Sequence, residues 1–172
     1  TVSGSVRNNS ENGFGIVIGY PLFRQKGRTN YSMKFSGDVE AQGIHLPSRP
    51  NGDCTIAMWV KLEYAENWQA LYMDYRTNDF GMMYHSNSSG PGGTGLIRIY
   101  PKEIDVYFNL SDGNWHHIVL VQEGNLASIW IDGELKGNGE NVDNPTHSGG
   151  YFGIYGTEEH YFLIGHLDEI GL

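Results

Sequence analysis

Short runs in which apolar and polar residues alternate dominate this chain. Two of them, His116–Gln122 and Leu126–Asp132, are rich in β-branched and aromatic residues, which favour a pleated, half-buried strand. Glu123-Gly124-Asn125 lies between them, and Gly and Asn tolerate the positive φ of a tight turn. Asp132-Gly133 is the dipeptide favoured in a two-residue type I′ hairpin. The segment Asp112–Gly137 therefore predicts three antiparallel strands joined by two tight turns.

Runs of the same kind recur along the rest of the chain. No apolar stripe of helical spacing has a useful length, so we expect an all-β fold, a two-sheet antiparallel β-sandwich. Thr1–Glu11 is predicted to be a polar leader, and Ser86–Thr94 and Gly137–Gly150 are predicted to be long loops. The other expected strands are Phe14–Tyr20, Asn30–Gly37, Gly43–Leu46, Thr55–Leu62, Gln69–Tyr75, Phe80–His85, Leu96–Tyr100, Glu103–Leu110, Phe152–Tyr155 and Tyr161–Ile170.

The length of 172 residues and the 24 glycines fit one such domain, residues 1–172. Cys54 is the one cysteine, so no disulfide can form within the chain. It begins a strand whose apolar residues share its face, so we expect a small buried apolar residue rather than a reactive thiol. No apolar run approaches the ~20 residues of a transmembrane helix, so we expect no membrane insertion.

The formal net charge is −9, from 20 acidic and 11 basic residues. Nucleic acids and anionic membrane surfaces bind clustered Lys and Arg, so both are unfavourable partners. Neutral glycans and cations are compatible with this charge. An acidic sugar would have to bind in a local basic pocket, against the field of the whole chain.

Four blocks of sequence carry a resemblance to a known family. They are Y-S-M-K-F-S-G-D at Tyr31–Asp38, T-I-A-M-W-V-K at Thr55–Lys61, W-H-H-I-V-L-V with I-W-I-D-G-E-L inside Asp112–Gly137, and F-L-I-G-H-L-D-E-I at Phe162–Ile170. In this order they resemble the laminin-G-like jelly roll of the concanavalin A-like lectin/glucanase superfamily. The resemblance implies a jelly roll whose first and last strands lie side by side in one sheet, and the abrupt end after the last block suggests a module of a larger multidomain protein.

Groups that could perform catalysis are sparse. Glycosidases of this superfamily place their carboxylates on one strand, and Glu103 with Asp105 is a half-match that lacks the third carboxylate. We therefore expect no enzymatic activity and expect both residues to be solvated surface acids. Asp168 and Glu169 are adjacent on a strand, so they should point to opposite faces and form no dyad.

The same alternation excludes His116 and His117 as a chelating pair, and we expect one of the two in the core with satisfied ring nitrogens. Calcium is a candidate cofactor, because it binds loop oxygens. Related folds place a structural calcium near the terminal strands, where Asp38 and Asp168 could converge. Other candidate loops are 74–79, with Asp74, Asn78 and Asp79, and Glu140–Asn144.

Sugar binding needs flat aromatic surface and a few polar groups that fix the hydroxyls. Trp68 lies in a polar stretch and is a candidate exposed platform, whereas the other three tryptophans occupy positions that resemble family core positions. Arg76 or Arg98 could bind a ligand carboxylate bidentately. On the concave sheet and its rim, the predicted ligand-binding residues are Trp68, Tyr72, Arg76, Tyr84, His85, Arg98, Tyr100 and Asn109.

These observations predict a non-catalytic, lectin-like carbohydrate-binding module for adhesion, secreted or on a cell surface. Its partners would be polysaccharide or glycans on host or neighbouring cells. It resembles modules of bacterial surface proteins, pilus-associated adhesins and polysaccharide-processing enzymes. Two alternatives stay open: a protein-binding adhesion domain of laminin-G type, and a glycoside hydrolase or lyase.

Overall fold

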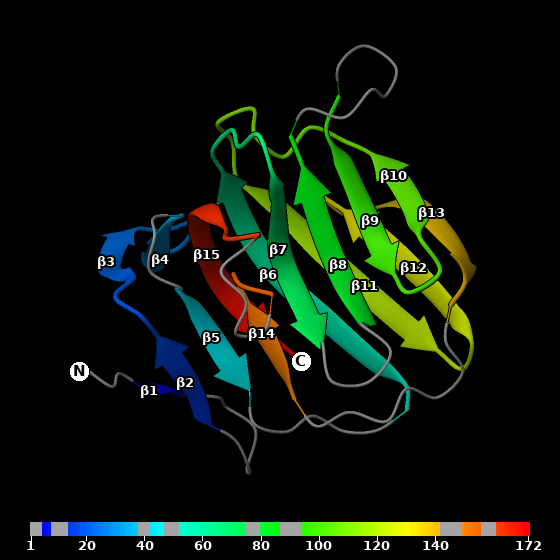
Figure 1. Ribbon diagram of the computed structural model, residues 1–172, viewed down its shortest axis with the longest axis horizontal. Helices are drawn as coiled ribbons and strands as arrows, with labels where there is room; N and C mark the ends of the chain where they lie inside the picture. The colour runs from blue at the N-terminus through cyan, green and yellow to red at the C-terminus, as the bar shows by residue number, and fades with distance from the viewer. Residues whose placement is uncertain are drawn as a thin grey trace.

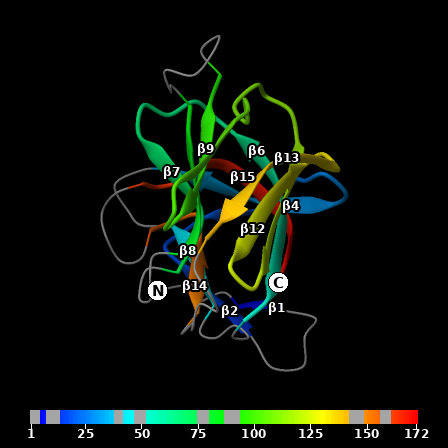
Figure 2. The same cartoon turned by 90° about the vertical axis from the view of Figure 1, so that its right-hand side faces the viewer.

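A computed structural model describes residues 5–7, 14–37, 42–46, 52–74, 80–86, 94–141, 149–155 and 161–172 of the chain. These residues form two antiparallel sheets that face each other (Figures 1 and 2). In sheet A the strands follow the order β1 (Ser5–Arg7), β2 (Phe14–Ile18), β5 (Gly43–Leu46), β14 (Gly150–Phe152), β7 (Trp68–Asp74), β8 (Phe80–His85), β9 (Leu96–Tyr100) and β10 (Ile104–Tyr107).

Sheet B lies behind sheet A in Figure 1. Its strands follow the order β13 (Glu134–Glu140), β12 (Leu126–Ile131), β11 (His116–Glu123), β6 (Cys54–Leu62), β15 (Ile164–Gly171), β4 (Tyr31–Ser36) and β3 (Leu22–Lys26). The last strand, β15, pairs with β4 and β6 in this sheet, whereas the first strands, β1 and β2, belong to sheet A. The expectation that the first and last strands lie side by side is therefore wrong. The described residues contain no helix that is long and apolar enough to cross a membrane.

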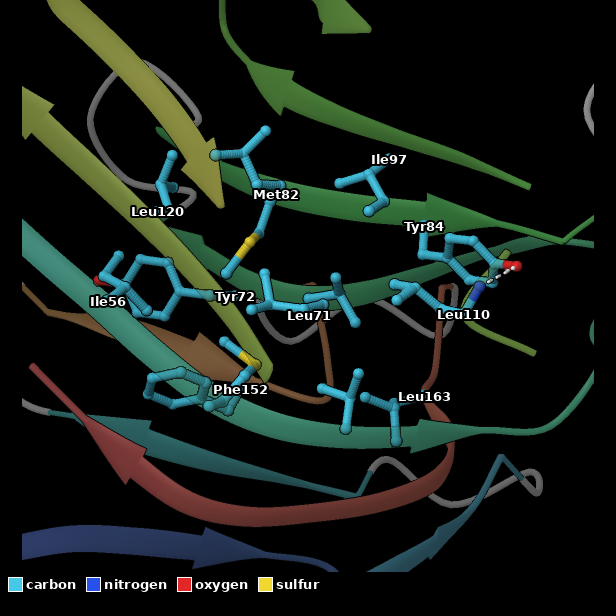
Figure 3. Packing of buried hydrophobic residues seen from close by; sticks show 14 of the residues in the cluster. Ile56, Leu71, Tyr72, Met82, Tyr84, Ile97, Leu110, Leu120, Phe152 and Leu163 are labelled. Carbon is cyan, nitrogen blue, oxygen red and sulfur yellow. Dashed lines mark hydrogen bonds between the residues drawn. The ribbon is translucent and has the colours of Figure 1, made fainter. Parts of the chain in front are cut away.

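The apolar core fills the space between the two sheets. Along β6 the burial alternates, so that Ile56, Met58 and Val60 are fully buried while the residues between them point outward. In Figure 3, Ile56 and Leu120 of sheet B lie opposite Tyr72 and Met82 of sheet A. Burial of each such side chain contributes about 1.5–3 kcal/mol, so this shared core holds the two sheets together. Cys54 is half-buried and packs against the same core.

The meander β11–β12–β13 has the predicted form. Asp132 and Gly133 have φ values of 53° and 84°, the positive pair that a type I′ turn requires. Gly124 in the preceding turn has a φ of 55°. The predicted loop at Gly137–Gly150 is wrong at its start, because β13 continues to Glu140 and pairs with β12.

Two strands were not expected from the pattern. Ser5–Arg7 pairs with β2, so the predicted polar leader is wrong for these residues. Leu22–Lys26 pairs with β4 at the edge of sheet B, although four of its five residues are exposed. A strand this exposed shows no apolar alternation, which is why its sequence gave no signal. The loop residues 87–93 and 142–148 lie outside the described residues.

Candidate functional site

The outer face of sheet A carries the first group of predicted site residues. Met82 and Tyr84 of β8 point into the core, so the alternation turns Met83 and His85 outward. Arg98 is the cross-strand partner of Met83, and Trp68 is the partner of His85. These residues therefore lie together on three adjacent strands.

Trp68, at the start of β7, is held by two neighbours on this face. The His85 ring meets the indole edge to face, with ring centroids 5.1 Å apart. The guanidinium carbon of Arg98 lies 5.5 Å from the indole centroid, within the range of a cation–π contact. Trp68 is thus half-buried and fixed in one orientation.

Arg98 is bound by acids of its own chain. Its Nε and Nη2 donate to the two oxygens of Asp105 at 2.7 and 2.8 Å, and its Nη1 lies 3.5 Å from Glu103. The hydrogen bonding of Arg98 to Asp105 is the main reason that the pKa of Arg98 is raised. The prediction that Arg98 binds a ligand carboxylate bidentately is therefore wrong, because Asp105 occupies its two donors.

The same contacts correct the account of the two carboxylates. Glu103 lies in the turn before β10 with a φ of 56°, so it does not share a strand face with Asp105. Asp105 is neutralised by Arg98 rather than solvated alone. The two carboxylates share one partner, the Arg98 guanidinium.

Trp68 belongs to an aromatic cluster on this face of sheet A. Ala70, Met73 and Met83 form its buried floor, and Trp68, Tyr100 and Tyr155 pack against them. Burial raises the pKa of Tyr100, an effect that the nearby Arg98 charge opposes. Tyr100 was predicted at this site, whereas Tyr155 was not.

Tyr161 is a further member that sequence reasoning missed. Its ring lies 6.0 Å from that of Tyr155, edge to face. Its carbonyl accepts a hydrogen bond from the Ala70 amide at 2.9 Å, which ties the segment before β15 to β7. Tyr161 has a φ of 63°, an irregular backbone that alternation does not predict.

An open cavity of about 600 Å³ adjoins this cluster at Trp68. Its walls come from the β6–β7 connection and from the segment before β15. Tyr64, Trp68 and Tyr161 supply aromatic surface, and Glu66 and Asn67 supply polar groups. Tyr64 and Tyr161 are 57% and 38% exposed, so their rings are available to a ligand.

Three predicted ligand-binding residues are structural instead. Tyr72 and Tyr84 are fully buried, with Tyr72 against Phe152 in the core. The Tyr84 hydroxyl accepts from the Leu110 amide at 3.1 Å (Figure 3) and lies 3.3 Å from Asn109 Oδ1. Asn109 Oδ1 also accepts from the Ser111 amide, so Asn109 shapes its own loop rather than facing a ligand.

The other three tryptophans were expected in the core, but they lie outside it. Trp59 and Trp130 belong to the outward-facing residues of β6 and β12, where Trp130 is 38% exposed. Trp115 is half-buried beside His166, with ring centroids 5.9 Å apart. Strand alternation places Ile56, Met58 and Ile129 inward and leaves the indoles on the outer face of sheet B.

Within the described residues, no group of three or more His, Cys, Asp or Glu side chains could hold a metal ion. Asp168 accepts from the amides of Arg28 and Glu169 at 2.8 and 2.9 Å. Asp74 is 1% exposed. Asp38, Arg76, Asn78 and Asp79 lie outside the described residues. Calcium binding stays a prediction.

His116 is the buried histidine that was expected. Its Nδ1 lies 2.8 Å from Asp132 and its Nε2 lies 3.1 Å from Asp112, so both ring nitrogens are satisfied. Burial alone would raise the pKa of Asp132, but hydrogen bonds from His116 and from the His117 amide outweigh it and lower this pKa.

The family model Laminin_G_3, described as Concanavalin A-like lectin/glucanases superfamily, matches residues 35–172. The chain belongs to this superfamily. The expected laminin-G-like jelly roll is thereby confirmed. No curated protein matches the sequence.

Two solved structures share the fold at low identity. Domain 4 of AbnA, a GH43 extracellular arabinanase from Geobacillus stearothermophilus in complex with arabinotriose, is 16% identical with a TM-score of 0.65, over 88% of this chain and 74% of that one. The binding domain of Paraclostridial Mosquitocidal Protein 1 is 14% identical with a TM-score of 0.62. That match covers 88% of this chain and 42% of the other, so this chain spans less than half of it.

Proposed function

We propose that this chain is a non-catalytic carbohydrate-binding module and that its sugar site is the cavity beside Trp68. The observation that carries the proposal is the meeting of Tyr64, Trp68 and Tyr161 around one open cavity with polar groups at its rim. The apolar face of a pyranose or furanose ring packs on such aromatic surface, while Glu66 and Asn67 can bond its hydroxyls.

The contacts of Trp68 favour binding. Because His85 and Arg98 already hold the indole, little side-chain entropy is lost when a sugar packs against it. The positive charge of Arg98 is balanced by Asp105, so the site favours a neutral sugar. A structural neighbour that is a domain of an arabinanase was solved with arabinotriose, which supports arabino-oligosaccharides as the first probes.

The proposal includes a setting for the module. A binding module without its own catalytic pair acts by holding a larger protein near its target. We therefore place it in a secreted or cell-surface multidomain protein, with polysaccharide or cell-surface glycans as partners. Adhesion, including adhesion by a pilus-associated protein, is one use of such a module.

The test is a glycan array followed by calorimetry with arabinotriose and with the best array ligands, in calcium and in EDTA. Tyr64→Ala and Trp68→Ala should each weaken binding about tenfold, since one aromatic contact is removed. Trp130→Ala, which removes an exposed indole from sheet B, is the matched control and should leave binding unchanged. Tyr64 is more than half exposed, so its replacement tests the site without disturbing the packing.

No binding of any glycan under either condition would overturn the proposal. Loss in EDTA alone would show that calcium takes part in binding. Release of reducing sugar by the wild-type chain would instead support the hydrolase alternative.

The protein-binding alternative is favoured by one observation. Tyr20, Leu22 and Phe23 are each about half exposed at the edge of sheet B, with exposed fractions of 56%, 58% and 47%. An exposed apolar edge strand is a surface on which another polypeptide can pair. A blank glycan array together with loss of a protein partner in Phe23→Ser would favour this function.

A further inference from the structure

A row of basic and aromatic side chains crosses the outer face of sheet B. His166 of β15 has Lys34 of β4 as its partner on one side and Lys61 of β6 on the other. Trp115 immediately precedes His116, the partner of Val60, and so falls beside Lys61. Directly opposite residues in neighbouring strands lie about 5 Å apart, so the four side chains form a continuous row.

A groove of about 610 Å³ lies along this row. Lys61, Trp115 and His166 line one part of it, and Gln25, Lys26 and Arg28 line the rest from the end of β3 and the β3–β4 turn. The groove is separate from the Trp68 cavity, because the two share no lining residue.

The groove holds cationic groups that the protein does not neutralise. Lys34 is paired with Glu63 at 3.0 Å. Within the described part of the chain, no carboxylate forms an ion pair with Lys26 or Lys61. In a chain of net charge −9, acidic side chains usually surround the basic ones. Two ammonium groups without such a partner in one groove therefore favour an anionic ligand.

Arg28 adds a third cation in a fixed position. Its guanidinium carbon lies 4.9 Å from the centroid of the Trp59 ring, a cation–π contact that leaves its N–H groups at the edge. Two acids lie at this turn: Asp168 accepts from the backbone amides of Arg28 and Glu169, and Glu169 accepts from the Thr29 hydroxyl. Among the described residues neither acid forms an ion pair with Lys26, Arg28 or Lys61, so these three cations keep their charged groups available to a ligand.

Trp115 and His166 supply the features that suit a sugar. The half-buried indole of Trp115 gives the groove an aromatic wall. The Nδ1 atom of His166 is occupied by Ser32 Oγ at 3.0 Å, which fixes the ring. Burial, followed by the charge of Lys34, lowers the pKa of His166, so its ring is a neutral hydrogen-bonding group near pH 7.

We propose that this groove binds an acidic saccharide, a sugar that carries sulfate or carboxylate groups. Lys26, Arg28 and Lys61 contact the anionic group, and Trp115 packs on the sugar ring. This second site takes a different ligand from the Trp68 cavity and does not depend on the function proposed there. It makes the chain a module with two separate sugar sites.

The test uses one polymer with three substituents: dextran sulfate, carboxymethyl dextran and unmodified dextran, each immobilised and offered the whole chain at low salt. The wild-type chain should bind the first two and not the third. Lys26→Gln and Lys61→Gln should each weaken that binding about tenfold, the cost of one charged hydrogen bond. Lys102→Gln removes an exposed lysine from the turn between β9 and β10 of sheet A and is the matched control.

Two further measurements distinguish recognition of the sugar ring from recognition of the anionic group, and distinguish the basic groove from the Trp68 cavity. Trp115→Leu should weaken binding of dextran sulfate and leave the affinity for inorganic sulfate unchanged. Trp68→Ala should leave dextran sulfate binding unchanged, even if it abolishes binding of neutral glycans. Thermal unfolding of each variant shows whether it is folded.

The proposal is overturned by any of four results. These are equal binding to dextran and dextran sulfate, equal losses in Lys61→Gln and Lys102→Gln, loss of dextran sulfate binding in Trp68→Ala, or complete competition by inorganic sulfate at the same sulfate concentration. The last result would define a site for a small oxyanion rather than for a saccharide.

Discussion

The carboxylate of Asp168 accepts a hydrogen bond from the backbone amide of Arg28, 2.8 Å away and 140 residues earlier in the chain. The contact ties the β3–β4 turn to the last strand. Gly27 makes the close approach possible, because a Cβ at this position would lie 2.5 Å from the Asp168 oxygen. The position of Arg28 in the basic groove therefore depends on a residue of β15.

Replacing Asp168 should loosen this turn. Asp168→Ala removes a charged acceptor and should lower the free energy of unfolding by about 1–2 kcal/mol, measured by urea denaturation. Asp168→Asn keeps an acceptor oxygen and should cost less. Faster hydrogen exchange at the Arg28 amide in the Ala variant would locate the effect, and equal losses in the two variants would contradict this account.

The Arg98–Asp105 pair should support sugar binding through Trp68. Asp105→Ala releases Arg98 from its bidentate contact, so Arg98 should spend less time over the indole. A double-mutant cycle of Asp105→Ala with Arg98→Met, measured on the free energy of sugar binding, should give a coupling energy of about 1 kcal/mol. The two side chains are less than a third exposed, so solvent screens their interaction only in part. Glu103→Ala should have a smaller effect, since Glu103 is 3.5 Å away and 59% exposed. A zero coupling energy would refute the interaction.

Acid should weaken the contacts around His116. Burial alone would raise the pKa of Asp112, but hydrogen bonds that it accepts from Asn114 and His116 outweigh burial and lower this pKa. Hydrogen bonds from His116 and from the His117 amide do the same for Asp132. A carboxylate with a lowered pKa stabilises the fold above its unfolded pKa of about 4, and this stability is lost as the pH falls through the folded value. Urea midpoints should therefore fall more steeply below about pH 4 in the wild type than in His116→Gln. Parallel curves for the two proteins would contradict the prediction.

Tyr84→Phe should separate a structural role from a binding role. The change leaves the buried Leu110 amide without its acceptor and should cost about 1–3 kcal/mol in thermal or chemical unfolding. Sugar binding by the folded variant should not change, because the ring lies in the core. Tyr107→Phe, at a half-exposed position on β10, is the control. A loss of affinity without a loss of stability would restore Tyr84 to the binding face.

Strands β6, β11 and β12 were predictable because their buried and less buried residues alternate. Three further strands, β5, β8 and β9, are more continuously buried and have the predicted bounds. Which face a residue occupies was less predictable. Strict alternation puts Trp68 and Tyr72 on the same side of β7, but a register shift between Ala70 and Tyr72 turns Tyr72 into the core.

A second β-bulge, in β15, explains why another sequence prediction was wrong. Asp168 and Glu169 were expected on opposite faces, yet Asp168 bonds the Arg28 amide and Glu169 bonds the Thr29 hydroxyl at 2.7 Å, in one turn. Glu169 has a φ of 46° inside the register shift of β15, so the backbone does not alternate there. A bulge depends on tertiary pairing, and the local sequence does not reveal it.

The candidate sites depend on contacts between distant segments, which is why they were predicted only in part. Trp68, His85, Arg98 and Tyr100 follow from strands that are adjacent in sequence. Tyr161 joins them through the long return of the chain to β7. The basic groove needs β3, a strand that had no recognisable pattern, in the same sheet as β6 and β15.

Because β15 lies between β4 and β6, the sheet it completes cannot form in the order in which the ribosome makes it. Residues 31–36 and 54–62 are synthesised long before residues 164–171, and until then the two segments have no strand to join them. Their unpaired edges would be exposed to other chains during this delay. The lysines of these and neighbouring segments, Lys26, Lys34 and Lys61, then serve a second purpose, since charge on an open strand discourages aggregation before the last strand arrives.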